Sequence, residues 1–281
     1  MTHLRRTPWL VLVATMLAPW GAQAQNTSGA GFYPFRGTAR TIGMAGAYFA
    51  VADDTAGLQW NPAGMAQLNT RQGEATIKVN GSGEQYLHFA FISPVKPGQF
   101  GCGVQLFRAA DGAGRSDRIA EFTYGQYATS EIAFGGTVKY QDAKTSSNSS
   151  DNFSFDIGVL YRPKQYKQWT AALTVLDINE PSFTGMGLQK RTYNFGLGYR
   201  PDSKTVLDLD WYDVGSIAKR GQARFGAERQ VTNNFALRAG VAENTFGVGL
   251  SLMFKYVTVD YGFQHVSDAS DLNMLSLTGN F

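Results

Sequence analysis

The sequence contains few of the residues on which disulfide scaffolds, metal sites and soluble domains depend. It has one cysteine among 281 residues, so no internal disulfide can form, and no Cys/His pair has metal-ligand spacing. Charged residues make up only 17% of the chain, below the roughly 25% usual in soluble domains. The net charge of +3 includes no run of Lys or Arg that would mark a nucleic-acid site. We therefore expect no metal, no cofactor and no nucleic-acid partner.

Long apolar runs are equally scarce, and the one near the N-terminus is short. Arg5 and Arg6 precede an apolar stretch at 9–18, which is followed by the small-x-small tripeptide at 22–24. A membrane anchor needs about 20 apolar residues, so this pattern favours a secretory signal peptide over residues 1–24, cleaved after the tripeptide. Beyond it, no window approaches the roughly 18 apolar residues of a spanning helix. We expect an exported mature chain without a membrane-spanning helix.

What the sequence has instead is an alternating pattern built from glycine and bulky apolar residues. It contains 32 Gly, 19 Phe, 13 Tyr and 5 Trp, a composition that suits extended strands better than helices. Between 246 and 254, bulky residues occupy every second position and mostly small residues lie between them. A period of two separates the faces of a β-strand. Segments of this kind, separated by turn residues, are typical of transmembrane β-barrels.

We count about fourteen such segments, which predicts an all-β, antiparallel transmembrane barrel. A secreted β-sandwich also alternates, but it buries its bulky face against a second sheet and rarely needs so many long strands. The predicted strands lie near 73–80, 84–93, 99–108, 117–127, 130–141, 153–162, 168–177, 190–200, 204–213, 221–230, 234–242, 245–254, 256–263 and 272–281.

The connections between these segments alternate in length, as in outer-membrane barrels with short periplasmic turns and longer external loops. The longer ones include 142–152 and 178–189, while 128–129 and 201–203 are short. This parity predicts that both termini are periplasmic. Three apolar side chains of the external loop 178–189 are expected to form a small exposed docking patch: Phe183, Met186 and Leu188.

Residues 29–68 differ in kind from the predicted strands, because they are rich in Gly and Ala and lack the period of two. They contain the motifs Gly43-Met44-Ala45-Gly46-Ala47, Ala50-Val51-Ala52-Asp53-Asp54 and Trp60-Asn61-Pro62-Ala63-Gly64-Met65. The order Ala-Gly-Ala, Ala-x-Ala-Asp-Asp and Asn-Pro-Ala resembles the N-terminal hatch of the FadL-type outer-membrane transporters of long-chain fatty acids and hydrocarbons. The motifs His88-Phe89-Ala90 and Gln99-Phe100-Gly101-Cys102-Gly103 look like the second and third strands of that family.

This resemblance implies a hatch that folds inside a fourteen-stranded barrel, surrounded by the lipid of a bacterial outer membrane. It divides the chain into a signal peptide at 1–24, a hatch at 25–70 and a barrel at 71–281. Side chains alone do not fill so wide a barrel, and an open one would leak polar solutes. We therefore expect the hatch to plug the lumen.

Within the hatch, six residues are candidates for plugging the barrel or contacting a ligand: Gly46, Asp53, Asp54, Asn61, Pro62 and Ala63. Pro62 fixes its backbone and Asn61 can cap a turn. A tight turn is thus the simpler interpretation of this element, and direct contact with a ligand is the alternative. Asp53 and Asp54 are expected to anchor the hatch to basic side chains of the lumen.

The inward positions of the predicted strands carry charges of both signs. Buried charges need partners, so a polar network that holds the hatch is favoured over a substrate site. A hydrolase would need Ser, His and a carboxylate together, but His88 has no serine on its face and His265 lies in a predicted loop, so we expect no enzyme. The candidate network residues are His88, Lys139, Asp156, Asp208, Asp210, Arg224 and Arg238, with Gln105, Glu131, Glu228 and Asp260 on the same faces.

Two functions follow from the resemblance. One is hatch-gated, passive uptake of a small hydrophobic ligand, with a lateral opening in the wall near Gly101 and Gly103. Glycines within strands mark bulges or bends, although simple packing against the hatch is an alternative role for both. The other function is that of the shorter PorV/PorQ-like relatives, which are outer-membrane components of a protein secretion or surface-attachment system. The compact chain also resembles these relatives, so this role, with secretion machinery as the partner, is the alternative to uptake.

Overall fold

The structure, a computed structural model, describes residues 36–79, 83–110, 114–214, 221–267 and 270–281. The expected signal peptide and residues 25–35 of the expected hatch lie outside the described residues. No helix in the described part of the chain is both long and apolar enough to cross a membrane.

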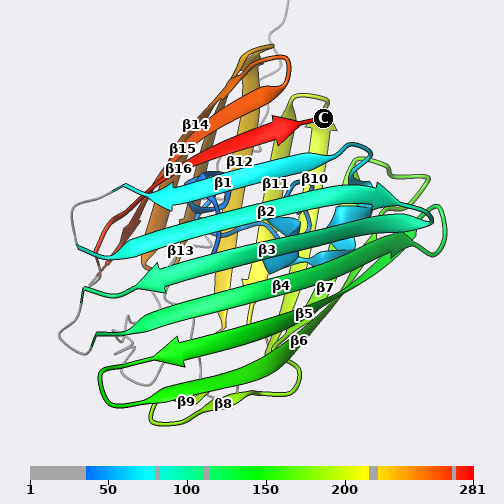
Figure 1. The fold of residues 1–281 in the computed structure, drawn as a ribbon. Helices are drawn as coiled ribbons and strands as arrows, with labels where there is room; N and C mark the ends of the chain where they lie inside the picture. Colours follow the sequence, from blue (N-terminus) through cyan, green and yellow to red (C-terminus); the bar gives the residue numbers. More distant parts are fainter. Residues whose placement is uncertain (1–35, 80–82, 111–113, 215–220, 268–269) are drawn as a thin grey trace, which may run out of the picture.

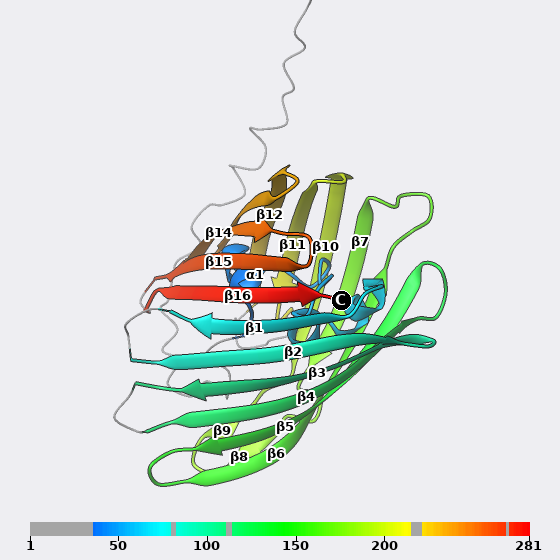
Figure 2. The same ribbon diagram turned by 45° about the horizontal axis from the view of Figure 1, so that its top comes forward.

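Within these residues, fourteen antiparallel strands form a closed barrel whose wall follows the chain from β1 to β16 (Figures 1 and 2). The predicted all-β antiparallel barrel is confirmed, and every predicted strand overlaps an observed one. A separate two-stranded sheet joins β8 (Ser182–Phe183) to β9 (Gly187–Leu188). The barrel strands are β1 (Gln72–Lys78), β2 (Gln85–Val95), β3 (Gly98–Arg108), β4 (Ser116–Tyr127), β5 (Ile132–Lys144), β6 (Ser149–Tyr161), β7 (Trp169–Leu176), β10 (Thr192–Asp202), β11 (Thr205–Tyr212), β12 (Gln222–Thr232), β13 (Phe235–Ala242), β14 (Thr245–Met253), β15 (Val257–Val266) and β16 (Leu272–Asn280).

The first and last strands close the barrel at a seam. The register of β1 and β16 pairs Gln72 with Asn280 and Thr76 with Ser276. On the inner face, the hydroxyl oxygens of Thr76 and Ser276 are 2.6 Å apart. Because the two strands are antiparallel, the start of β1 and the C-terminus lie at the same edge of the barrel (Figure 2).

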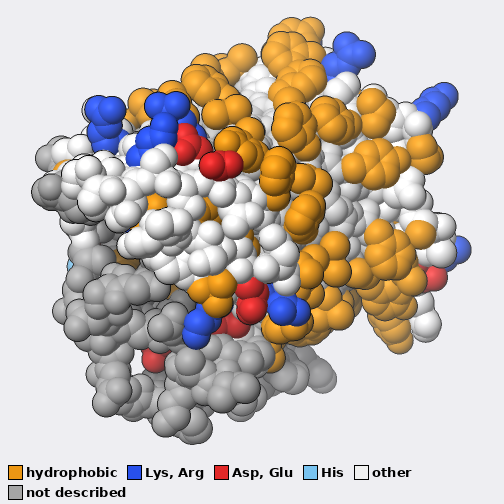
Figure 3. Space-filling view, turned by 60° about the horizontal axis from the view of Figure 1, so that its bottom comes forward, with side chains coloured by type: hydrophobic (Ala, Val, Ile, Leu, Met, Phe, Trp, Pro, Cys, Tyr) orange, Lys and Arg blue, Asp and Glu red, His pale blue; other side chains and the backbone are white. Residues whose placement is uncertain are grey.

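The two faces of the wall separate apolar from polar side chains. In β6, Phe153 and Phe155 are exposed on the outer face, whereas Asp156 is buried on the inner face. In Figure 3, apolar side chains cover much of the visible surface, and most charged side chains lie toward its margins. Near one edge of the wall, the rings of Trp169 and Tyr199 are 4.4 Å apart. An apolar band with aromatic residues near its edge is the surface that a barrel presents to lipid.

The connection between β5 and β6 is much shorter than predicted. The expected loop 142–152 is mostly strand, because β5 and β6 continue into it and leave only the turn 145–148. This end of the hairpin is rich in Ser, Asn and Asp. Without bulky residues at alternate positions, the sequence gives no sign of the two strands there.

The connection between β7 and β10 also differs from the prediction. It folds into the β8–β9 hairpin, and its Phe183 is only 2% exposed, packed against Ile119 of β4 and Ala143 of β5. Met186 is partly buried in the same cluster, while Leu188 remains exposed. The predicted exposed patch is therefore wrong for Phe183, because this side chain has an apolar partner surface that is distant in the sequence.

The described residues ahead of β1 form the segment 36–68, here called the hatch segment, which lies inside the barrel (Figures 1 and 2). It contains α1 (Ala39–Gly43), α2 (Gly57–Trp60) and the 3-10 helix η2 (Pro62–Gln67). α1 contacts β13 to β16, and η2 contacts β3 to β6. The hatch segment thus reaches opposite sides of the lumen.

Candidate functional site

Inward-facing glycines let the hatch segment approach the wall at backbone distance. A Cβ at Gly240 would lie 2.2 Å from the carbonyl carbon of Met44, and one at Gly135 would lie 2.3 Å from that of Pro62. Any side chain at these positions would push the hatch segment away. The alternation of small and bulky residues therefore has a physical cause, because the small face meets the hatch segment and the bulky face is exposed.

The first half of the hatch segment is held by β11. Asp210 Oδ2 accepts hydrogen bonds from the backbone N–H groups of Tyr48 at 2.5 Å and Phe49 at 2.9 Å. Asp208 lies two residues earlier on the same face, and both aspartates are fully buried. Buried charges were expected to pair with opposite charges, but Asp210 instead satisfies two backbone donors of the hatch segment.

Arg40 of α1 is the centre of an ion-pair network between hatch segment and wall. Its guanidinium makes two 2.9 Å contacts with Glu228 of β12 and lies 2.6 Å from Asp53 and 2.9 Å from Asp54. Asp53 also accepts a hydrogen bond from Arg200 of β10 at 2.9 Å. Asp53 thus contacts a basic side chain of the lumen, whereas Asp54 pairs with Arg40 of the hatch segment itself.

Burial affects these two carboxyl groups differently. It raises the pKa of Asp54 to about 6, and the attraction of Arg40 offsets this effect only in part. Burial also acts on Asp53, but there Arg40 and Arg200 together outweigh it and lower the pKa of Asp53. The pKa of Arg40 is raised well above its ordinary value, since the surrounding carboxylates outweigh its own burial. Asp53 is therefore the charged anchor of the hatch segment, whereas burial makes ionisation of Asp54 less favourable.

Arg238 of β13 extends the network along the wall. Its Nη1 lies 2.9 Å from Asp260 of β15, and its Nε lies 3.0 Å from Glu228. The hydroxyl group of Ser251 on β14 contacts both Arg238 and Asp260. Arg238 is 5% exposed, so its buried charge has carboxylate partners on two strands, as burial of a charge requires.

Arg224 of β12 lies among aromatic rings. Its guanidinium carbon is 4.4 Å from the ring centroid of Tyr212 and 5.8 Å from that of Trp60, within the range of cation–π attraction. It also donates to the carbonyl oxygen of Gly46 at 3.3 Å. Gly46 has a φ of +74°, and a Cβ there would lie 2.8 Å from Arg224. Glycine at 46 thus serves both the turn and the close approach of Arg224.

Asn61, Pro62 and Ala63 begin η2. The Asn61 side chain accepts a hydrogen bond from the Ala63 N–H at 3.1 Å and donates to the carbonyl oxygen of Phe49 at 2.8 Å. Pro62 occupies the first helical turn, where its missing N–H leaves no hydrogen bond unmade. A Cβ at Gly158 of β6 would lie 2.2 Å from Asn61 Oδ1, so this cap lies directly against the wall. Both polar atoms of Asn61 are engaged by the hatch segment's own backbone.

His88 lies between two buried glutamates on the inner face of β1 to β4. Its Nε2 is 3.3 Å from Glu121, and its Nδ1 is 3.7 Å from Glu74, which accepts a hydrogen bond from Thr55 of the hatch segment at 2.8 Å. Glu121 reaches His88 across β3 because Gly103 has no side chain, and a Cβ there would lie 2.7 Å from Glu121 Oε1. No cluster of His, Cys, Asp and Glu among the described residues is arranged to hold a metal ion.

Lys139 of β5 joins the wall to the connection after β7. Its Nζ lies 2.7 Å from Asp156 of β6 and 2.5 Å from Asp177. Asp177 also accepts a hydrogen bond from Ser154 at 2.6 Å and lies 3.9 Å from Arg36, at the start of the hatch segment. The two buried aspartates and Lys139 thus form a compact group at the junction of the wall, the connection and the hatch segment.

The second half of the hatch segment meets the wall mainly through apolar side chains, together with a 2.5 Å hydrogen bond from Arg162 to Gln67. Leu58, Met65 and Leu68 pack against Ala90 and Ile92 of β2 in one buried cluster. These five residues are called the apolar layer below. Dispersion and the hydrophobic effect, which have no preferred direction, hold this contact together.

Gly101 and Gly103 lie on the inner face of β3, beside the apolar layer. A Cβ at Gly101 would lie 2.8 Å from Met65 and 3.0 Å from Leu58, so this glycine makes room for the hatch segment. Both glycines are paired with residues of β2 and of β4. The wall is thus continuous at both positions in this structure, and a lateral opening there stays a prediction.

Some inward residues differ from the sequence-based expectation. Glu131 lies in the turn between β4 and β5, where it accepts a hydrogen bond from the Lys164 N–H at 2.6 Å, because both strands end before reaching it. Sequence reasoning missed Arg40, Glu74 and Glu121. The two glutamates occupy inward positions of predicted strands, so the alternation contained the signal for them. Arg40 precedes the barrel and has no such signal.

The closed wall, apolar outside and charged inside, and the segment it encloses define a transmembrane β-barrel with an internal hatch. No known family model and no curated protein matches the sequence. Solved structures do match the fold. The deltaS2 mutant of the monoaromatic hydrocarbon channel TodX superposes with a TM-score of 0.67 at 12% identity, over 89% of this chain and 100% of that one.

Two further channels have a similar fold. The monoaromatic hydrocarbon channel CymD has a TM-score of 0.62 at 12% identity, covering 87% of this chain and 97% of its own. A FadL homologue from Pseudomonas aeruginosa has a TM-score of 0.58 at 12% identity, covering 87% of this chain and 98% of its own. At such low identities the likeness shows the fold alone. That fold, a closed outer-membrane-type barrel, agrees with the barrel that the sequence predicts.

Proposed function

We propose that the protein lets small hydrophobic compounds cross a bacterial outer membrane by passive diffusion, with the hatch segment as the gate. The apolar layer is the observation that carries this proposal. In it Leu58 and Met65 meet the wall through apolar contacts, whereas the first half of the hatch segment is held by hydrogen bonds and ion pairs. A hydrophobic compound can replace apolar contacts of the layer at small cost, because such contacts have no fixed geometry.

The solved channels with this fold support the proposal, since they are described as channels for monoaromatic hydrocarbons and, for TodX of Pseudomonas putida, as a toluene transporter. A compound that follows the apolar layer reaches the inner side of β3 at Gly101. From there the shortest way out of the charged lumen leads sideways through the wall into lipid. We propose that β3 parts from a neighbouring strand at Gly101 and Gly103 during passage.

A role in protein secretion has less support. Besides the compact chain, its sequence-based argument used an exposed apolar patch in the connection after β7, and Phe183 of that patch is buried. Leu188 alone is a small isolated apolar site, of a kind common on protein surfaces. We therefore propose the channel function only.

Uptake of N-phenyl-1-naphthylamine, a hydrophobic fluorescent probe, by intact Gram-negative cells producing the protein tests the proposal. In the Gly101→Val variant, the added side chain enters the apolar layer, where even its Cβ would lie 2.8 Å from Met65. We expect uptake to fall to the level of cells without the protein. The matched control is Gly136→Val on β5, where the nearest atom to a new Cβ is 3.6 Å away. This control should take up the probe like the wild type.

Both variants must reach the membrane in equal, folded amounts, which heat-dependent electrophoretic mobility measures. If Gly101→Val is folded and takes up the probe at the wild-type rate, the apolar layer is not the route and the proposal fails.

A further inference from the structure

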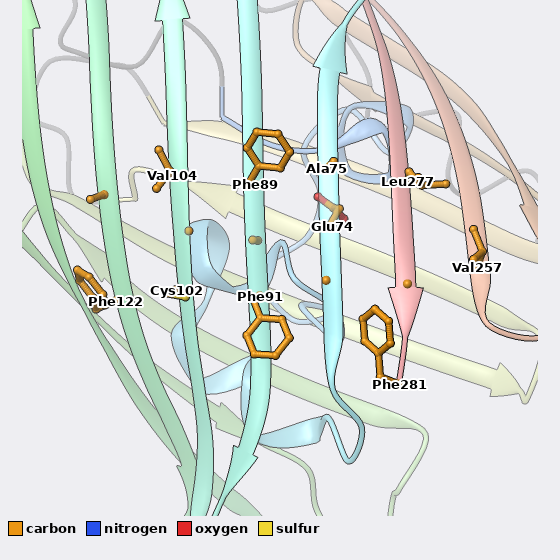
Figure 4. A pocket seen from close by; sticks show the side chains of 15 residues that line it. Glu74, Ala75, Phe89, Phe91, Cys102, Val104, Phe122, Val257, Leu277 and Phe281 are labelled. Atoms are coloured by element: carbon orange, nitrogen blue, oxygen red, sulfur yellow. The ribbon is translucent and has the colours of Figure 1, made fainter.

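The outer face of the wall has an open apolar groove across β16, β1, β2, β3 and β4 (Figure 4). Its volume is about 610 Å³, within the range of roughly 300–1,000 Å³ of small-molecule sites. Unlike the hatch contacts, the groove faces away from the lumen. Its lining includes Gly103, so it borders the point where the uptake route proposed above leaves the wall.

The groove exists because small residues replace bulky ones on neighbouring strands. Its floor includes Ala75 of β1, Cys102 of β3 and Ala120 of β4, which bring three small outward residues together on nearby strands. Phe91 and Phe281 stand at its sides (Figure 4). An outward hollow of this size would lose van der Waals contacts unless an apolar chain filled it.

The groove opens toward the barrel edge that carries the C-terminus. Phe281 lies at this edge, and its ring covers Gly279, where a Cβ would be 3.1 Å from the ring. The backbone N–H of Phe281 donates to the carbonyl oxygen of Arg71 at 3.0 Å. The apolar wall of the groove is thus directly joined to a residue with a basic side chain.

Two more basic residues lie at the same edge of these strands. Lys96 is in the turn between β2 and β3, and Lys255 is in the turn between β14 and β15. Together with Arg71 they are exposed. The edge segments 69–73, 93–100, 253–259 and 277–281 contain no Asp or Glu. The C-terminal carboxylate of Phe281 adds one negative charge here, so the three basic side chains leave this sector with a net positive charge beside the groove.

We propose that the groove binds an acyl chain of an anionic glycerophospholipid, whose headgroup is attracted to the basic edge that carries Arg71, Lys96 and Lys255. An acyl chain suits the apolar lining, and an anionic headgroup suits the positive edge. The predicted orientation of the barrel puts this edge on the periplasmic side, where the lipid belongs to the inner leaflet. Such a site would bind lipids with an anionic headgroup more tightly than lipids with a zwitterionic headgroup.

Native mass spectrometry of the delipidated mature protein tests this site by titration with phosphatidylglycerol and phosphatidylcholine of identical acyl chains. We expect one retained phosphatidylglycerol per barrel and weaker retention of phosphatidylcholine. The Arg71→Gln/Lys96→Gln/Lys255→Gln variant should lose this preference, at about fivefold in affinity per removed charge. The matched control is Lys164→Gln/Lys167→Gln/Lys204→Gln, which removes basic residues from other turns and should retain the preference.

Ala75→Phe fills the floor of the groove and should abolish retention of both lipids. Its control is Ala239→Phe, an outward exposed position on β13, which should bind lipid like the wild type. If Ala75→Phe does not fold, Ala120→Leu fills the other side of the groove and serves instead. Equal retention of the two lipids by the wild type, or wild-type retention by the folded groove variants, would overturn the proposal. A dimer that Ala75→Phe dissociates would also overturn it, because the occupant would then be a second copy of the chain.

Discussion

The two halves of the hatch segment are attached to the barrel by different kinds of interaction. The first half is fixed by directional contacts, such as those of Asp210 with the backbone and of Arg40 with Glu228. The second half, around Leu58 and Met65, contacts β2 through apolar side chains. Hydrogen bonds and ion pairs specify one geometry, whereas apolar contacts tolerate exchange of one apolar partner for another. The comparison indicates a hatch segment with many directional contacts to the wall in its first half and few in its second half, such as that of Gln67 with Arg162.

Removing both halves of the hatch segment should have the largest effect on the ion conductance of the barrel. Deletion of residues 29–66 takes away the hatch segment and leaves an unfilled barrel of fourteen strands, which is too wide for side chains to close. We expect a steady ion current in planar bilayers, where the complete protein conducts little. Equal conductance of the deleted and complete proteins would show that the hatch segment does not block the lumen.

Loosening only the anchored half should have a smaller effect. Asp210→Ala leaves the N–H groups of Tyr48 and Phe49 without their acceptor, at a cost of roughly 2–5 kcal/mol in the free energy of unfolding. We expect this loss in denaturant titrations followed by tryptophan fluorescence, together with intermittent ion current. Met65→Ala, in the apolar layer, is the contrasting variant. It should increase probe uptake without ion current. If the two variants behave alike, the proposed difference between the two halves of the hatch segment is wrong.

The smallest effect concerns the pH dependence of the anchored half. The pKa of Asp54 is about 6 in the folded protein and about 4 in an unfolded chain, so the folded state binds the proton more tightly. The contribution of Asp54 to stability therefore falls as pH rises from about 4 to 6. Asp54→Asn should remove this decline, worth on the order of 2 kcal/mol.

Asp53→Asn is the control for this prediction, because the pKa of Asp53 is lowered in the folded protein. Asp53 contributes stability above its ordinary pKa and loses it as pH falls, so its removal should change the pH profile in the opposite direction. The effect of Asp53 lies below about pH 4 and that of Asp54 between about pH 4 and 6, so unfolding free energies measured from about pH 2 to 8 distinguish the two, and identical profiles would contradict the assignment.

The wall was largely predictable because alternation is a local property of the sequence. Phe246 and Gly247 show which face meets lipid and which meets the hatch segment without any knowledge of their neighbours. Contacts between distant segments were not predictable in this way. The burial of Phe183 requires β4 and β5 as partners, and the backbone partners of Asp210 depend on how residues 48 and 49 turn inside the barrel. The charged residues at inward positions indicated a polar network in the lumen. Which of these residues pair with each other depends on the three-dimensional structure.

The hatch segment also touches both sides of the seam between β1 and β16. The Ala39 N–H donates to the Ser276 hydroxyl of β16 at 2.9 Å, and Thr55 donates to Glu74 of β1 at 2.8 Å. These strands are separated by nearly the whole barrel sequence, and a slip of one residue in their pairing would turn the polar face toward lipid. By contacting one residue on each strand, the segment fixes the pairing of the first and last strands from inside the barrel.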